Sequence, residues 1–425
     1  MGLNMDFAAV STVSLVFLVL IPLAFTAGPL TGHSVLRVWP AGEKQVTLLQ
    51  ELLSMRKSLD IWKGPSCATC PVDIRLTPFE YDDVTSSLKE NNFKVETMIS
   101  DIQHVLDSQR RDLKYKPKAA VFDYSKYHTL DEINAWTMNI TNVYDSMTSV
   151  FNVTKSYEGR SLMGFKISTP SPFARSAFWI EGGIHAREWI SPATVIYMVG
   201  QMLDRYKIDP DITTLVDSFE WYILPVTNPD GYAYTWQSDK TRLWRKTRSK
   251  HGLCYGVDPN RNWDIEWSKS GASKDPCSDT YCGPKAFSEV EVKGVSDFLR
   301  NISGLKGFID FHSYSQLWMS PWGYTKKLPK DFKQQDEGSA AAVDALQKVF
   351  GTKYEHGTIA NIIYTASGSS ADWTYGKIGV KYSYGVELRD TGKYGFLLPA
   401  DQIIPSGQET LQALIGLAAY IKDNS

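Results

Sequence analysis

The second half of this 425-residue chain alternates short apolar runs with amphipathic stretches. Each apolar run is short enough to be one buried strand. The four runs are residues 177–182, 221–226, 307–311 and 380–386. Residues 191–206 and 288–300 instead repeat apolar side chains at helical spacing, and Ser191 followed by Pro192 favours a helix N-cap at Ser191. We therefore predict one large α/β domain over residues 119–425.

A shorter block with a different pattern precedes this domain, from about Gly28 to about Asp107. Three alternating segments predict strands, and two segments with helical spacing predict helices. The strands are residues 35–38, 72–76 and 93–99, and the helices are residues 43–57 and 78–89. The pattern predicts a small α+β domain over residues 28–107.

Residues 1–27 predict a secretory signal peptide. Residues 7–25 are largely apolar, and small side chains at 24 and 26–28 provide a cleavage zone. Asp6, with no Lys or Arg before the run, departs from the usual signal pattern. A retained membrane anchor is the alternative, which Pro22 and several polar residues disfavour. We expect the protein to be secreted and extracellular.

Residues 108–118, between the two blocks, carry five basic side chains. These are Arg110, Arg111, Lys114, Lys116 and Lys118. One interpretation is the solvated end of a helix. The position between two blocks of a secreted chain favours a second interpretation, a processing site for a trypsin-like protease.

Composition excludes some classes of function. The chain is 43% hydrophobic and 22% charged, which is typical of a globular protein, and its net charge is −2. That charge gives no electrostatic reason to expect nucleic acid or an anionic membrane as a partner. Sequons for N-glycosylation begin at Asn139, Asn152 and Asn301 and fit a secreted chain. The cysteine count is five, so at least one thiol has no intrachain partner.

Three apolar runs end near side chains that could do chemistry: His185, His312 and Glu387. Because ligands bind at the carboxyl ends of strands in open α/β sheets, these residues could converge there. His185 and Glu188 are three residues apart and could hold one zinc ion, although this spacing alone is common by chance. His312 would be a third ligand, leaving one position for water; otherwise it is a hydrogen-bonded structural residue. Asp258 could orient a ligand imidazole.

Glu387 and a group of arginines extend this candidate site. Glu387 is costly to bury without a partner, so it is either a general base or half of a surface ion pair with Arg389. Arg245 and the pair Asn260-Arg261 lie among tryptophans, which favours a fixed anion site over a solvated basic face. The arginine fork is suited to bidentate bonds with a carboxylate.

Five motifs stand in order along the chain. They are His-Ala-Arg-Glu-Trp-Ile (185–190), Asn-Arg-Asn-Trp (260–263), His-Ser-Tyr-Ser-Gln (312–316), Ser-Ser-Ala-Asp-Trp (369–373) and Glu-Leu-Arg-Asp-Thr-Gly (387–392). With these motifs the chain closely resembles the secreted zinc metallocarboxypeptidases of the pancreatic A/B type, in proenzyme form. The resemblance covers nearly everything after residue 27. It implies a mixed central β-sheet flanked by helices, an inhibitory propeptide domain over 28–107 and an activation segment over 108–118.

The resemblance also implies the roles of individual residues. His185, Glu188 and His312 would bind one Zn²⁺ per chain, with Glu387 as the general base for zinc-activated water. Arg245 would stabilise the oxyanion. The remaining candidates bind substrate: Asn260, Arg261 and Tyr364 grip the terminal carboxylate, and Arg187, Arg242, Ser313 and Tyr314 line the approach. The implied partners are peptide or protein C-termini and an activating trypsin-like protease, and the expected state is a monomer.

The family resemblance also points to the preferred substrate. Met319, Ile359, Ile363, Ala366 and Ala371 would form the pocket for the last side chain. B-type members place an Asp where this chain has Ala371, so an A-type preference for aromatic or aliphatic ends is expected. Asp310 leaves a B-type preference for Lys or Arg as an alternative, because it shares strand parity with His312; otherwise it is a hydrogen-bonded residue at the pocket edge. A catalytically inactive binding homologue is a further alternative, disfavoured because all ligands and the base are present.

The cysteines match the family in part. By resemblance, Cys254 and Cys277 form a disulfide. Cys282 would be unpaired or intermolecular, because Ser268 stands where some members have its partner. Cys67 and Cys70 are expected to be a local disulfide or an idle pair, since two ligands are too few for a structural zinc site.

Overall fold

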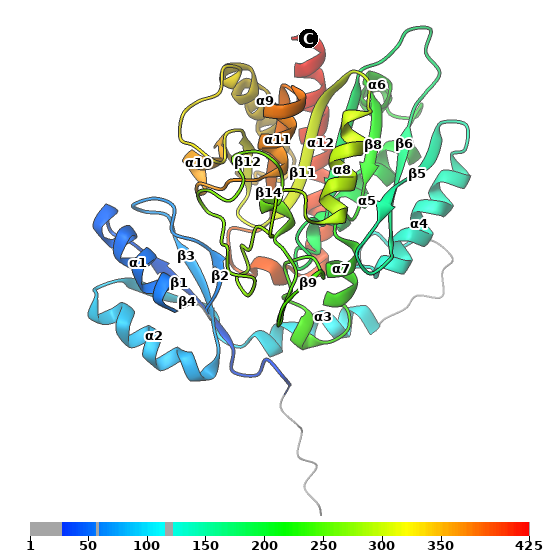
Figure 1. The fold of residues 1–425 in the computed structure, drawn as a ribbon. Coiled ribbons are helices and arrows are strands. Elements are labelled where there is room, and N and C mark those ends of the chain that lie inside the picture. The colour runs from blue at the N-terminus through cyan, green and yellow to red at the C-terminus, as the bar shows by residue number, and fades with distance from the viewer. Residues whose placement is uncertain (1–27, 57–58, 115–121, 425) are drawn as a thin grey trace, which may run out of the picture.

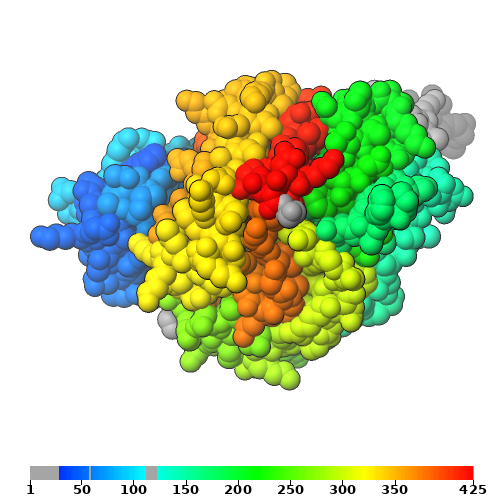
Figure 2. All heavy atoms as spheres, turned by 90° about the horizontal axis from the view of Figure 1, so that it is seen from above, coloured from blue at the N-terminus to red at the C-terminus, as the bar shows by residue number. Residues whose placement is uncertain are grey.

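The computed structural model describes residues 28–56, 59–114 and 122–424 and divides them into two domains (Figure 1). The expected signal peptide and residues 115–118 of the basic segment lie outside the described residues. No helix within the described ranges is long and apolar enough to cross a membrane. The N-terminal domain forms a lobe on one side of the larger domain, as Figure 2 shows from above.

An eight-stranded mixed sheet forms the centre of the larger domain, in the order β13-β12-β14-β11-β7-β8-β6-β5. The neighbouring strands β14, β11, β7 and β8 run parallel, whereas β12 pairs antiparallel with β14, and β6 pairs antiparallel with both β8 and β5. The strands are β5 (Thr148–Lys155), β6 (Ser161–Ile167), β7 (Ala177–Gly182), β8 (Glu220–Leu224), β11 (Leu305–Ser313), β12 (Leu317–Ser320), β13 (Glu355–Thr358) and β14 (Tyr382–Leu388). The predicted mixed α/β fold is confirmed.

Helices cover both faces of this sheet because successive strand residues point to opposite sides. Phe178 and Ile180 of β7 join a core with α4 (Leu130–Val143), α5 (Ile190–Asp204) and α12 (Ile403–Asp423), whereas Trp179 joins another core. The second core includes α8 (Val290–Arg300) and α11 (Ser370–Ile378). The other helical segments are α6 (Pro210–Ser218), α7 (Pro229–Thr235), α9 (Phe332–Phe350), α10 (Ile359–Ile362), η1 (Asp239–Thr241), η2 (Pro259–Arg261), η3 (Gly395–Leu397) and η4 (Ala400–Gln402). A two-stranded ribbon joins β9 (Lys250–His251) to β10 (Cys254–Tyr255).

The N-terminal domain is a four-stranded antiparallel sheet with the order β2-β3-β1-β4, as expected for a small α+β unit. Apolar side chains of the sheet, among them Leu36 and Ile74, pack against Leu49 and Leu88 of two helices. The elements are β1 (Ser34–Trp39), α1 (Glu43–Met55), β2 (Asp60–Lys63), β3 (Val72–Leu76), α2 (Pro78–Glu90), β4 (Lys94–Ile99) and α3 (Ile102–Lys114). The sequence pattern did not reveal β2, which has only four residues.

Helix α3 crosses the expected boundary between residues 107 and 108. The amide of Gln109 donates to the carbonyl of Leu398 (3.1 Å), and Arg110 forms an ion pair with Asp239 (2.6 Å). The first seven residues of the basic segment are therefore helical, and this part of the helix is attached to the larger domain. For residues 108–114 the structure therefore agrees with the first interpretation of the basic segment, the end of a helix.

Candidate active site

The carboxyl ends of three parallel strands bring the predicted chemical residues together. In the β11–β14 ladder His312 lies opposite Glu387, and in the β7–β11 ladder Phe311 lies opposite Gly182. His185 follows three residues after the end of β7. The parallel order therefore places His185, His312 and Glu387 at one edge of the sheet.

The turn after β7 is fixed by Ser191, although not as a helix cap. Helix α5 begins at Ile190 with Trp189 as N-cap, so the predicted N-cap at Ser191 is wrong. The Ser191 hydroxyl instead accepts from the amide of Gly183 (2.9 Å) and donates to the carbonyl of Phe311 (2.5 Å). Gly183 has φ +62°, and a Cβ there would lie 3.0 Å from Pro192, so the turn requires glycine. This turn delivers His185 toward β11.

Three buried side chains converge on one point. Nδ1 of His185 lies 2.8 Å from Oε1 of Glu188, and Nδ1 of His312 lies 3.1 Å from Nδ1 of His185. Among the described residues this is the one group of three or more His, Cys, Asp or Glu side chains that could hold a metal ion. Although burial alone would raise the pKa of Glu188, the two histidines hold it well below its usual range. Two imidazole nitrogens and a charged carboxylate are a ligand set that zinc prefers.

Asp258 supports the first imidazole, as the sequence predicted. Its Oδ1 lies 3.2 Å from Nε2 of His185, and its Oδ2 accepts from the guanidinium of Arg245 (2.9 Å). Asp258 itself is held at the start of η2, where it accepts from the amide of Asn260 (2.9 Å). One carboxylate therefore orients both a metal ligand and the candidate oxyanion arginine.

A cavity lies beside the two histidines, and Glu387 of β14 lines it together with His185 and His312. Glu387 does not pair with Arg389, whose guanidinium instead binds Glu409 (2.7 Å). Its Oε2 has no hydrogen-bond partner among the residues that the structure describes. Burial, with the charge of Glu188 adding, raises the pKa of Glu387 to about 8, although His312, Arg245 and Lys63 oppose the shift. A buried carboxyl with a free oxygen beside a metal site is suited to accept a proton.

The candidate carboxylate clamp lines the cavity next to the metal ligands. Asn260, Arg261 and Tyr364 are all part of this lining. The Asn260 side chain accepts from the amide of Ser370 (2.9 Å), and Arg261 donates to the carbonyl of Gly271 (2.9 Å). The Arg261 guanidinium lies 5.7 Å from the centre of the Tyr364 ring. The hydrogen bond to the Gly271 carbonyl holds the Arg261 guanidinium in place, where it can bind an anion that enters the cavity.

Comparison with known proteins assigns this chain to a family. Residues 133–413 match the family described as zinc carboxypeptidase, and residues 36–109 match carboxypeptidase activation peptide. The chain belongs to the zinc carboxypeptidase family. It is 42% identical to carboxypeptidase A2 of Mus musculus over 92% of this chain and 94% of the relative. It is 49% identical to carboxypeptidase B of Astacus astacus over 71% of this chain and 99% of the relative.

One solved structure resembles this chain across both domains. The crystal structure of thrombin activatable fibrinolysis inhibitor is 36% identical to this chain and superposes with a TM-score of 0.85. The match covers 93% of this chain and 100% of that one. This carboxypeptidase is therefore a zymogen with an N-terminal activation peptide, and its His-Glu-His group fits one zinc ion per chain.

The activation peptide reaches into the cleft of the zinc carboxypeptidase through β2. Arg187, expected to line the approach, lies 3.0 Å from Asp60 and 3.6 Å from Asp279. The Tyr314 hydroxyl donates to Asp73 (2.6 Å) of the activation peptide. A cavity of about 760 Å³ remains between the two domains, lined by Trp62 among others. The residues of β2 and Asp279 were missed in the sequence, where no motif distinguishes them.

Two further approach residues lie behind the cleft surface. Arg242 donates to the carbonyls of Arg187 (2.8 Å) and Phe396 (2.9 Å) and stacks 3.7 Å from the Trp189 ring. It is not among the residues that line the cavity. The amide of Ser313 donates to Glu188 (3.2 Å). Arg242 therefore holds other parts of the site through its side chain, whereas Ser313 holds Glu188 through its backbone amide; the Ser313 hydroxyl is buried and has no hydrogen-bond partner among the described residues.

The expected pocket residues share the cavity with the metal ligands. Met319, Ile359, Ile363, Ala366 and Ala371 all line it, together with Gly385. A Cβ built at Gly385 would meet no heavy atom within 4 Å, so open space lies above this glycine. Asp310 is absent from the lining; its Oδ2 accepts from the Ser370 hydroxyl (2.7 Å) and lies 3.0 Å from Nε2 of His312. The pocket walls are thus mainly apolar.

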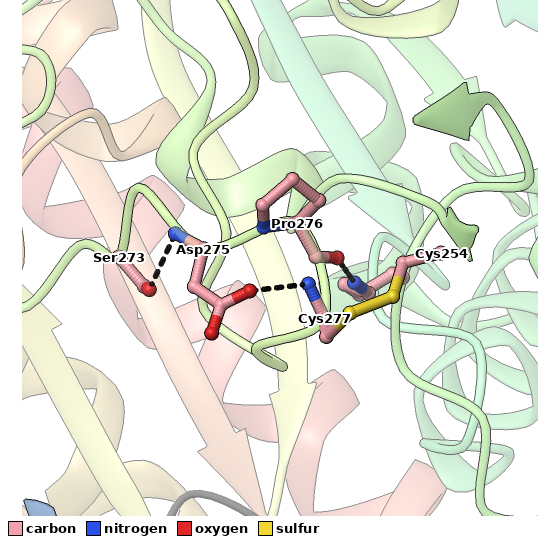
Figure 3. The surroundings of a disulfide bond; sticks show 6 residues. Cys254, Ser273, Asp275, Pro276 and Cys277 are labelled. Carbon is pink, nitrogen blue, oxygen red and sulfur yellow. Dashed lines mark hydrogen bonds between the residues drawn. A yellow bond between two sulfur atoms is a disulfide. The ribbon is translucent and has the colours of Figure 1, made fainter. Parts of the chain in front are cut away.

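The disulfides follow the predicted pairing. Cys254 and Cys277 are bonded, and Figure 3 shows Asp275 beside them, accepting from the amide of Cys277 (3.0 Å). Cys67 and Cys70 form the local disulfide in the activation peptide. Cys282 is buried and has no partner within the chain, as expected.

Proposed function

We propose that this chain is a secreted monomeric zymogen that becomes an A-type carboxypeptidase after a trypsin-like protease cuts the basic segment. The mature enzyme would remove the last residue of peptides that end in an aromatic or aliphatic side chain. The observation that carries the A-type preference is the apolar pocket around Ala371. A pocket of this kind excludes a charged end, because an unpaired ammonium or guanidinium would lose its hydration there.

Arg261, Asn260 and Tyr364 would bind the terminal carboxylate of the peptide. Bidentate bonds from a fixed guanidinium set the position of the chain end, and therefore the position of the last peptide bond. The interior of a protein chain offers no such carboxylate, so the clamp favours exopeptidase action. Ala371 and Ile363 would then contact the last side chain, while Arg187 contacts the residues before it.

Glu387 would take a proton from the attacking water and deliver it to the leaving amine. When bound, zinc supplies a Lewis acid that activates this water and polarises the scissile carbonyl. Arg245, held by Asp258, would stabilise the negative charge that develops on the carbonyl oxygen. His185, Glu188 and His312 would hold the ion throughout.

A B-type preference is the second candidate, supported by the similarity to carboxypeptidase B of Astacus astacus. Asp310 would have to supply the negative charge for a Lys or Arg end. Burial and two contacts disfavour this role: Asp310 is fully buried, and its Oδ2 is already bonded to Ser370 and close to His312.

The test is the substrate profile of the trypsin-treated protein. Peptides that differ only in a C-terminal Phe, Leu or Lys are compared by kcat/KM, each with and without a metal chelator. We expect chelator-sensitive release of Phe and Leu above Lys, and no release from the same peptides with amidated C-termini. If neither Phe, Leu nor Lys is released, the proposed peptidase activity is wrong. Preferential release of Lys would contradict only the A-type preference.

A further inference from the structure

The second metal ligand needs a hydrogen-bond acceptor behind it. Both ligand histidines turn Nδ1 toward the metal position, so each neutral imidazole carries its proton on Nε2. Nε2 of His185 has Asp258 as acceptor at 3.2 Å. Nε2 of His312 has two polar neighbours, the side-chain nitrogen of Asn260 at 3.2 Å and Oδ2 of Asp310 at 3.0 Å.

Asn260 cannot accept the proton of His312. Its oxygen already accepts from the amide of Ser370 (2.9 Å), and this bond turns its NH₂ group toward the imidazole. Two N–H groups that face each other do not form a hydrogen bond. Asp310 is a carboxylate and can accept, and it lies on the same face of β11 as His312.

We propose that Asp310 is the positioning residue for the zinc ligand His312, as Asp258 is for His185. The Ser370 hydroxyl, which donates to Asp310 at 2.7 Å, fixes the carboxylate and connects it to the pocket wall. This inference deepens the proposed function and rests on it through the zinc site. Asp310 therefore acts on the metal centre and not on the substrate side chain.

The two hydrogen-bond partners of Asp310 explain how a carboxylate is tolerated in this buried position. Asp310 is fully buried, and its Oδ1 has no hydrogen-bond partner among the described residues. An unpaired carboxylate in such a place is costly, whereas one that accepts from a metal-bound imidazole and a hydroxyl is stabilised. Carboxylates behind both histidines also make the imidazoles more basic, which strengthens metal binding.

The experiment measures zinc affinity of the full-length zymogen by competition with a chromophoric chelator. Asp310→Ala removes the acceptor, and we expect its zinc Kd to rise about 10- to 100-fold. Asp310→Asn keeps the shape and one acceptor oxygen, so its Kd should lie between those of the wild type and Asp310→Ala. Asp258→Ala is the positive control. Asp230→Asn changes another buried carboxylate, whose partners include Ser156 and Arg160 and neither histidine, and should leave Kd unchanged.

A second readout separates positioning from general destabilisation. With cobalt in place of zinc, Asp310→Ala should shift the visible absorption bands, because the orientation of His312 changes. A zinc Kd within threefold of wild type in Asp310→Ala, or a weaker Kd with an unchanged cobalt spectrum, would overturn the proposal. If Asp310→Ala does not fold, the isosteric Asp310→Asn carries the test, and a wild-type Kd overturns it. Both readouts are independent of peptide hydrolysis, so a failed peptidase assay leaves them valid.

Discussion

Asp60 of the activation peptide lies 3.0 Å from the guanidinium of Arg187, a residue of the catalytic cleft. The same carboxylate accepts from Arg75 (2.7 Å) on the neighbouring strand β3. Although burial would raise the pKa of Asp60, Arg187 and Arg75 lower it to about 2. Asp60 is therefore charged at neutral pH, and its ion pair with Arg187, which is largely buried, holds β2 in the cleft.

The substitution Asp60→Ala should weaken the inhibition of the uncleaved zymogen. It leaves Arg187 without its partner from the activation peptide, and breaking a buried pair costs about 3–5 kcal/mol. We expect at least a tenfold rise in hydrolysis of a small peptide by the zymogen, and faster release of the peptide domain after cleavage. Asp83→Ala is the matched control, because Asp83 is 71% exposed and pairs with Arg56 within the same domain. Equal effects of the two substitutions would contradict this view of β2.

The substitution Glu387→Gln should remove turnover while sparing the metal. The amide has the size of the carboxyl but cannot accept and return a proton, so kcat should fall about 10²- to 10⁴-fold. Zinc content, measured by atomic absorption, should stay at one ion per chain. Glu337→Gln on the surface of α9 serves as control. A variant with unchanged kcat would show that another group is the base.

The substitution Ala371→Asp should change the preferred end residue. A carboxylate at this position in the pocket can pair with a Lys or Arg side chain, and such charge-assisted bonds contribute about 1.5–3 kcal/mol. The ratio of kcat/KM for Lys over Phe ends should therefore rise about 10- to 100-fold. Ala371→Asn has nearly the same volume without the charge and should produce a much smaller change. If both variants give the same profile, Ala371 does not contact the last side chain.

Several parts of this site could be predicted from the sequence because they depend on local pattern. The runs that became β7, β11 and β14 are apolar on both faces, and strands buried between two helical layers have that composition. Parallel strands place their carboxyl ends together, so the convergence of His185, His312 and Glu387 followed from topology. The strand parity of Asp310 and His312 was also correct.

Other parts depend on contacts between distant segments and could not be predicted. Strand β2 is short and has no clear alternation; its position is set by Asp60 and Arg187, which are 127 residues apart. The second half of helix α3 lies in the basic segment, for which the sequence favours a processing site, and its contacts to Leu398 and Asp239 lie far along the chain. Ser191 has the composition of a helix cap, but the tertiary bond to Phe311 determines its role.

A buried acid away from the active site should make stability depend on pH. Burial, with Glu289 and Asp230 adding, raises the pKa of Glu291 from 4.5 to about 7, although the amide of Tyr157 opposes the shift. Between these values the folded chain holds a proton that the unfolded chain releases, so the free energy of unfolding falls as pH rises from about 4.5 to about 7.

The substitution Glu291→Gln should remove this dependence on pH. The stability of the variant relative to wild type should improve by about 2–3 kcal/mol between pH 4.5 and pH 8. Urea unfolding of the zymogen at both pH values measures the change. The exposed carboxylate of Glu96, replaced by Gln in parallel, should give no comparable gain. A constant difference across the pH range would contradict the assigned proton.

The space above Gly385 is empty, so the depth of the pocket depends on the absence of a side chain at this position. Strand β14 carries this glycine two residues before Glu387, so the proposed pocket floor and the proposed general base lie on the same strand. A small substituent on a ligand could occupy the space beside Gly385, where a Cβ would meet no heavy atom within 4 Å. Conversely, Gly385→Ala would shorten the pocket and lower the affinity for the largest aromatic ends first. Selective ligands for this enzyme can therefore be sought at the pocket floor, separately from its metal chemistry.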